Sequence, residues 1–73
     1  MTEQQWNAEF AKKLRYKMNA RGVDQKELAE SSGISETSIS RYLAGTQSPK
    51  MFAIAQIAKA LSASIFELLP YDR

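Results

Sequence analysis

Apolar residues recur at helical spacing along the whole 73-residue chain. The first stripe consists of residues spaced by four, Trp6, Phe10, Leu14 and Met18, with Ala11 beside them. Such spacing places side chains on one face of a helix. The pair Arg21-Gly22 indicates where this helix ends, because glycine is typical of the residue after a helix. The sequence therefore predicts a first amphipathic helix whose striped face lies in the core.

Two shorter helices are predicted next, joined by a tight turn at Gly33. Asp24 followed by Glu27 is a capping-box arrangement, so the second helix begins at about Gln25. Gly33 predicts a left-handed exit from it. The third helix is predicted over 35–44, before Gly45. Its apolar side chains, expected to face inward, are Ile39, Tyr42 and Leu43, and its outward set is Glu36, Thr37, Ser40, Arg41 and Ala44.

Two further helices complete the predicted architecture, which contains no strand. Pro49 precedes a fourth helix that runs to about Leu61. This helix has a wide apolar face, made of Met51, Ile54, Ala55, Ile57, Ala58 and Leu61. Ser64 with Glu67 forms a second capping box that begins a short last helix, and Pro70 ends it. The fold class we expect is all-α, as one domain spanning 1–73.

Composition narrows the possible functions. The chain is 44% hydrophobic and 25% charged, its apolar runs are too short to span a membrane, and its first residues lack a secretion signal, so we expect a cytoplasmic protein. It has no cysteine and no histidine, which removes disulfides, the usual zinc ligand sets and imidazole catalysis. We expect no metal, no cofactor and no enzymatic activity, since a catalytic site would have to use surface Ser, Lys or Glu side chains.

The net charge of +2 does not indicate whether the protein binds nucleic acid, but basic residues are concentrated from the first helix to the start of the second. Only one acid, Asp24, interrupts this stretch, which contains Lys12, Lys13, Arg15, Lys17, Arg21 and Lys26. A solvated helix face explains such a cluster as well as nucleic acid does. Only the neighbouring pair of short helices favours an interaction with phosphate.

The spacing of Gln25, Ala29, Gly33, Ile39 and Tyr42 resembles the helix-turn-helix of the phage repressor and Cro-like (XRE) DNA-binding proteins. The resemblance covers about residues 10 to 69 and includes the loop 45–49 after the third helix. It implies a compact, five-helix, lambda-repressor-like domain in which the second and third helices form the helix-turn-helix. It also implies a sequence-specific transcriptional regulator, a repressor, in a bacterial nucleoid or a phage-infected cell.

The sequence departs from the family pattern at two places. Ser32 stands where an apolar residue is usual, so we expect looser packing under the turn or a hydroxyl bonded to nearby backbone. Many members also have a buried Arg-Glu pair between the first and third helices, and the matching positions here are Met18 and Leu43. An apolar pair avoids the desolvation of two charges, so the motif tolerates this change.

The resemblance places the third helix in the major groove of an operator, where side chains on its outer face reach base edges. The expected base contacts are Glu36, Thr37, Ser40 and Arg41. Arg41 is the strongest candidate, because its guanidinium can donate two hydrogen bonds to one guanine. Instead of contacting a base, Arg41 could form a salt bridge on the protein surface. The expected phosphate contacts are Gln25, Lys26, Ser35, Thr46, Ser48 and Lys50. For Gln25 the alternative is an ordinary exposed residue in a first helical turn.

Family members usually bind palindromic DNA as symmetric dimers, so the resemblance also implies a homodimer on a palindromic operator. The apolar C-terminal region offers the interface, with Ile65, Leu68, Leu69 and Tyr71. The alternative is that these side chains complete a small core. A different function also stays open, that of an antitoxin or adaptor module whose helix-turn-helix scaffold mainly binds another protein.

Overall fold

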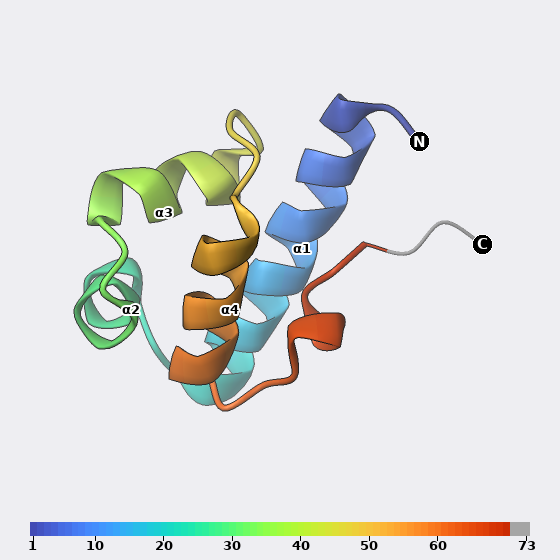
Figure 1. Ribbon diagram of the computed structural model, residues 1–73. Coiled ribbons are helices and arrows are strands. Elements are labelled where there is room, and N and C mark those ends of the chain that lie inside the picture. The colour runs from blue at the N-terminus through green and yellow to red at the C-terminus, as the bar shows by residue number, and fades with distance from the viewer. Residues whose placement is uncertain (71–73) are drawn as a thin grey trace.

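The structure, a computed structural model, describes residues 1–70. These fold into four α-helices and one turn of 3₁₀-helix, with no strand among them (Figure 1). The elements are α1 (Glu3–Arg21), α2 (Gln25–Ser32), α3 (Glu36–Ala44), α4 (Met51–Ala60) and the 3₁₀ turn η1 (Ile65–Glu67). The all-helical class is confirmed. The prediction of five α-helices was wrong in its last member.

The last predicted helix is a 3₁₀ turn because too few residues lie between its N-cap, Ser64, and Pro70 to form a series of α-helical hydrogen bonds. The predicted capping box is present, since the Ser64 amide donates to Glu67 Oε2 over 2.7 Å. The following amides bond three residues back, from Glu67 to Ser64 O and from Leu68 to Ile65 O. That pattern defines a 3₁₀ turn, and Pro70, which lacks an amide hydrogen, stands three residues after its end.

Capping side chains determine where the other helices begin. α1 begins with a capping box that the sequence prediction did not include, in which Gln5 N donates to Thr2 Oγ1 over 3.1 Å and Thr2 N to Gln5 Oε1 over 2.8 Å. The predicted box at α2 is confirmed, because Glu27 N donates to Asp24 Oδ1 over 2.8 Å. Both boxes satisfy amides that have no partner within the helix.

The turn between α2 and α3 depends on Gly33, whose φ of 77° lies in the left-handed region. Directly before it, Ser32 is buried, with 3% of its surface exposed, and its Oγ accepts a hydrogen bond from Ile34 N over 3.1 Å. The expected bond from this hydroxyl to local backbone is therefore confirmed. Gln56 Nε2 of α4 donates to Ser32 O over 3.4 Å, so α4 also supports the turn.

The core draws buried side chains from all four α-helices and from Leu61 and Leu68, which directly follow α4 and η1. The large side chains with almost no exposed surface are Phe10, Leu14, Leu28, Ile39, Ile57, Leu61 and Leu68. Trp6 stacks on Phe10 with ring centroids 5.6 Å apart, and Tyr42 meets the same ring edge-on at 6.3 Å. The predicted stripe of α1 is confirmed as core, with Trp6 half-buried at its end.

Predictions about two groups of apolar side chains were wrong in part. Of the face predicted for the fourth helix, Ile54, Ile57, Ala58 and Leu61 are buried as expected, whereas Met51 and Ala55 are exposed and Ala53 is buried instead. Leu68, expected in a dimer interface, is completely buried within the monomer, so it completes the core instead. Of the other residues expected there, Ile65 and Leu69 are half-buried and Tyr71 lies outside the described residues.

Across residues 1–70, no helix combines the length and the apolar character needed to cross a bilayer. Within the same range, acidic side chains nowhere gather closely enough to hold a metal ion.

Candidate DNA interface

One face of α3 is polar and fully accessible. Its residues Glu36, Thr37, Ser40 and Arg41 are all exposed, while Ile39 and Tyr42 on the opposite face are buried. The spacing of the exposed four places them together, because residues four apart share a helix face. The predicted division of α3 into an outer and an inner face is confirmed. α3 also lies along one edge of the molecule, where its outer face has no covering element (Figure 1).

Both ends of α3 are fixed by the local sequence. Ser35 is the N-cap: its Oγ accepts from Ser38 N over 3.1 Å and donates to Ser38 Oγ over 2.9 Å. At the other end Gly45 has a φ of 74°, and its amide donates to Tyr42 O over 3.1 Å. The Thr46 amide then donates to Arg41 O over 3.1 Å. These bonds give partners to the Tyr42 and Arg41 carbonyls at the end of the helix. The loop to α4 starts at this point.

The N-terminus of α2 carries two of the predicted phosphate contacts, Gln25 and Lys26, both exposed. The first amides of a helix attract anions. Here, however, the carboxylates of Asp24 and Glu27 lie in the same turn and form its capping box. Lys26 places one positive charge in this turn, beside the two carboxylates.

The loop from α3 to α4 carries three further candidates, which differ in accessibility. Thr46 and Lys50 are exposed. Ser48 is half-buried, and its Oγ lies 2.7 Å from Asn7 Oδ1 and 3.0 Å from Glu3 Oε2. The structure thus gives the Ser48 hydroxyl partners in α1, whereas the Thr46 hydroxyl donates to Arg41 O of α3 over 3.3 Å.

α1 supports α3 through Arg15, a member of the basic cluster. Its Nη2 donates to Leu43 O over 3.2 Å. Met18 is buried, and Leu43 is half-buried against the core. This burial agrees with the apolar pair expected at these two positions. A recess of about 320 Å³ adjoins this contact and is lined by Arg15, Met18, Asn19, Val23, Asp24, Gln25 and Leu43. Arg15 and Gln25 therefore lie on the same side of the molecule.

The basic cluster of α1 is largely engaged within the protein. Lys12 pairs with Glu9 at 3.8 Å, and Arg21 donates to Ser62 O over 3.2 Å. Lys17 forms an ion pair with Glu67 and donates a hydrogen bond to its carboxylate. This hydrogen bond lowers the pKa of Glu67 below its ordinary value, and so do the hydrogen bond from Ser64 N and the positive charges of Lys17 and Arg21. These partners favour the interpretation of the cluster as a solvated helix face, while Lys26 in α2 and Lys50 before α4 are exposed cations outside α1.

This geometry agrees with comparisons to known proteins. Residues 14–68 match the family model HTH_3, described as helix-turn-helix. The chain belongs to the HTH_3 helix-turn-helix family, as the resemblance predicted. No curated protein matches the sequence.

Three solved structures share the fold. An HTH_3 family transcriptional regulator from Vibrio cholerae superimposes with a TM-score of 0.88 at 24% identity, over 92% of this chain, which spans only 38% of that protein. The restriction-modification controller protein C.AhdI from Aeromonas hydrophila gives a TM-score of 0.83 at 27% identity, covering 86% of this chain and 96% of its own. A hypothetical transcription factor, NHTF, from Neisseria gives 0.85 at 27%, covering 96% and 80%.

All three neighbours are named as regulators of transcription or of a restriction-modification system, and none as an enzyme. The prediction that this chain is not an enzyme is supported by its family and these neighbours. The expectation of XRE-type helix-turn-helix architecture is likewise supported.

Proposed function

We propose that this protein is a transcriptional regulator that binds double-stranded DNA by sequence, with α3 in the major groove of an operator. The observation that carries the proposal is the outer face of α3, where four hydrogen-bonding side chains stand exposed on a helix whose other face is buried. A groove about 12 Å wide admits one helix, and side chains of such a face reach the base edges.

Arg41 is the principal base contact in this proposal. Its guanidinium fork matches the O6 and N7 acceptors of guanine. Thr37 offers a methyl group to thymine and a hydroxyl to a base or phosphate, and Glu36 accepts from cytosine or repels wrong sequences. Ser40 either contacts a base or provides clearance.

Phosphate contacts orient the protein on the duplex. Lys50 and Lys26 are the leading candidates, because they are exposed cations on either side of α3 in the chain. Gln25, Ser35 and Thr46 add neutral hydrogen-bonding groups. Ser48 can donate to a phosphate only by giving up a hydrogen bond to α1.

We further propose a homodimer that acts as a repressor by occupying a palindromic operator in the cytoplasm. One domain makes few base contacts, and two half-sites about 34 Å apart would double them. With Leu68 buried, the surface available near η1 consists of Ile65, Phe66 and Leu69, of which Phe66 is 63% exposed.

The second candidate function is a protein-interaction module, as in an antitoxin or adaptor. Exposed aromatic side chains favour it, since Phe52 is 71% and Tyr16 70% exposed. Such side chains are common anchors of protein interfaces.

Selection of binding sites from a random double-stranded DNA library at near-physiological salt separates these functions. The proposal expects enrichment of a palindrome with half-sites about 10 base pairs apart. A folded protein that enriches no sequence contradicts DNA recognition and supports the protein-interaction module.

A further inference from the structure

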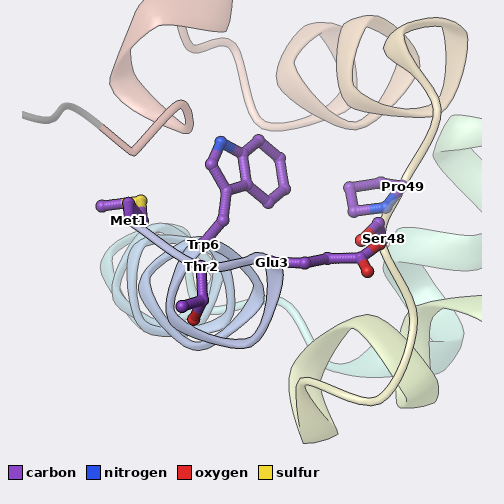
Figure 2. A pocket seen from close by; sticks show the side chains of 6 residues that line it. All are labelled: Met1, Thr2, Glu3, Trp6, Ser48 and Pro49. Carbon is purple, nitrogen blue, oxygen red and sulfur yellow. Dashed lines mark hydrogen bonds between the residues drawn. The ribbon is translucent and has the colours of Figure 1, made fainter.

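The loop that leaves α3 is tied to the first turns of α1 through a single side chain, Ser48. Its hydroxyl lies 2.7 Å from Asn7 Oδ1 and 3.0 Å from Glu3 Oε2. Figure 2 shows the Glu3 side chain extended from α1 towards Ser48 and Pro49, with Trp6 rising from the same helix beside them. Asn7 is buried, with 8% of its surface exposed, so its amide is fixed behind the loop.

A serine hydroxyl has one hydrogen to donate. Ser48 therefore donates to Asn7 or to Glu3 at any moment, and both acceptors lie on the α1 side. The distance of 2.7 Å to Asn7 is that of a good O–H···O hydrogen bond. The hydroxyl is thus directed into the protein and away from any DNA that α3 would contact.

Ser48 supplies a hydrogen bond to α1, which the structure gives to neither Thr46 nor Lys50 among the described residues. Thr46 bonds only to Arg41 O of the preceding helix, through its amide and its hydroxyl. Lys50 is the N-cap of α4 without any side-chain capping bond. Pro49 is buried. Among the described contacts, Ser48 is the residue through which the loop is hydrogen-bonded to a helix outside the helix-turn-helix.

We propose that Asn7 is a positioning residue for DNA binding: acting through Ser48, it holds the loop so that Thr46 and Lys50 reach phosphates. Asn7 itself touches no DNA. This inference rests on the proposed function, because it assigns a role to the loop only in a DNA complex. Preorganisation of this kind raises affinity by removing the entropy loss of ordering the loop on binding.

The test compares Ser48→Ala, Asn7→Ala and the double variant by titration of a selected DNA site at several salt concentrations. Each single variant is expected to weaken binding roughly three- to tenfold. It should also reduce the slope of log affinity against log salt concentration by about one unit, which corresponds to the loss of one phosphate contact. The double variant should bind no more weakly than the weaker single variant, because both changes remove the same hydrogen bond. Ser48→Thr, which keeps the hydroxyl, should restore both quantities. Ser31→Ala, a matched loss of an exposed hydroxyl bonded within α2, should change neither.

Independent losses in the double variant would overturn the inference, because they would mean that Ser48 contacts phosphate directly. Variants that bind with wild-type affinity and slope would overturn it as well. Failure of the wild-type protein to bind any duplex in a salt-dependent way would instead remove the proposed function.

Amide hydrogen exchange without DNA tests the anchoring separately. Ser48→Ala should increase the exchange rate of the Thr46 amide, which donates to Arg41 O, and an unchanged rate would contradict the anchor whatever the DNA result. Ser48 is only half-buried, so this variant keeps the test usable if Asn7→Ala does not fold.

Discussion

Arg15 donates a hydrogen bond from its guanidinium Nη2 to the carbonyl oxygen of Leu43, over 3.2 Å. This bond joins the middle of α1 to the last turn of α3, where helical carbonyls lack partners within the helix. It adjoins a recess that Met18 of α1 and Leu43 of α3 both line. α1 and α3 also meet in the core, where Tyr42 lies edge-on to Phe10 at 6.3 Å, so the orientation of α3 depends on core packing as well as on this surface hydrogen bond.

The apolar pair of Met18 and Leu43 yields a prediction about stability. Met18→Arg should lower the free energy of unfolding by about 3 kcal/mol, because the new charge would have to be desolvated at a position that is only 6% exposed. Adding Leu43→Glu should recover much of that loss, since it supplies the missing partner. Urea denaturation of both single variants and the double variant measures this coupling. Losses that simply add would show that the two side chains do not face each other.

Gly33→Ala isolates the effect of backbone conformation. No atom lies within 4 Å of where the added Cβ would stand, so the substitution meets no steric clash. Its effect comes from the φ of 77°, and we expect a loss of about 1 kcal/mol in the free energy of unfolding. Gly33→Asn should lose less, because asparagine tolerates this region. Thermal or urea unfolding tests both, and equal losses for the two variants would contradict the explanation.

Arg41 and Lys50 should differ in what their removal does to DNA binding. Arg41→Ala should reduce binding by about 1 to 3 kcal/mol and relax the preference at one base position. Lys50→Ala should weaken binding to all sequences equally and make the salt slope shallower by about one unit. Titrations of the selected site, single-base variants of it and unrelated DNA provide the comparison. If the two variants behaved alike, the assignment of one to bases and the other to phosphates would be wrong.

The ion pair between Lys17 and Glu67 makes stability depend on pH. The pKa of Glu67 lies below its ordinary value of 4.5, chiefly because Lys17 donates a hydrogen bond to the carboxylate. A lowered folded-state pKa stabilises the protein above the unfolded pKa, and the contribution disappears as pH falls through the folded value. The difference in unfolding free energy between wild type and Glu67→Gln should therefore be full above the ordinary pKa of 4.5 and shrink as the pH falls below it. A difference that stays constant over this range would contradict the lowered pKa.

Signals within a few residues predicted most of the fold. The pairs Asp24 with Glu27 and Ser64 with Glu67 marked two element starts correctly, and Gly33 marked the turn. The same kind of signal was available for Thr2 with Gln5 and was missed. η1 was predicted as an α-helix because a capping box specifies a start and carries no information about the length that follows.

Contacts between distant parts of the chain could not be predicted. Arg15 and Leu43 are 28 residues apart, Ser48 and Asn7 are 41 apart, and Lys17 and Glu67 are 50 apart. Such pairs depend on how helices pack, which hydrophobic spacing leaves open. Asn7 carried a partial signal, since it precedes the core residues Phe10 and Ala11 by three and four positions and so shares their helix face. The outer face of α3 needed no distant contact, and it was predicted correctly.

The central claim is that the outer face of α3 is the DNA-binding surface. NMR titration of the ¹⁵N-labelled protein with a short duplex carrying the selected site tests it most directly. The account predicts the largest amide shifts at the start of α2, in α3 and in the loop between α3 and α4. The residues concerned are Gln25, Lys26, Glu36, Thr37, Ser40, Arg41, Thr46 and Lys50. Shifts concentrated around Ile65–Glu67 and the outer face of α1, with α3 unchanged, would contradict it.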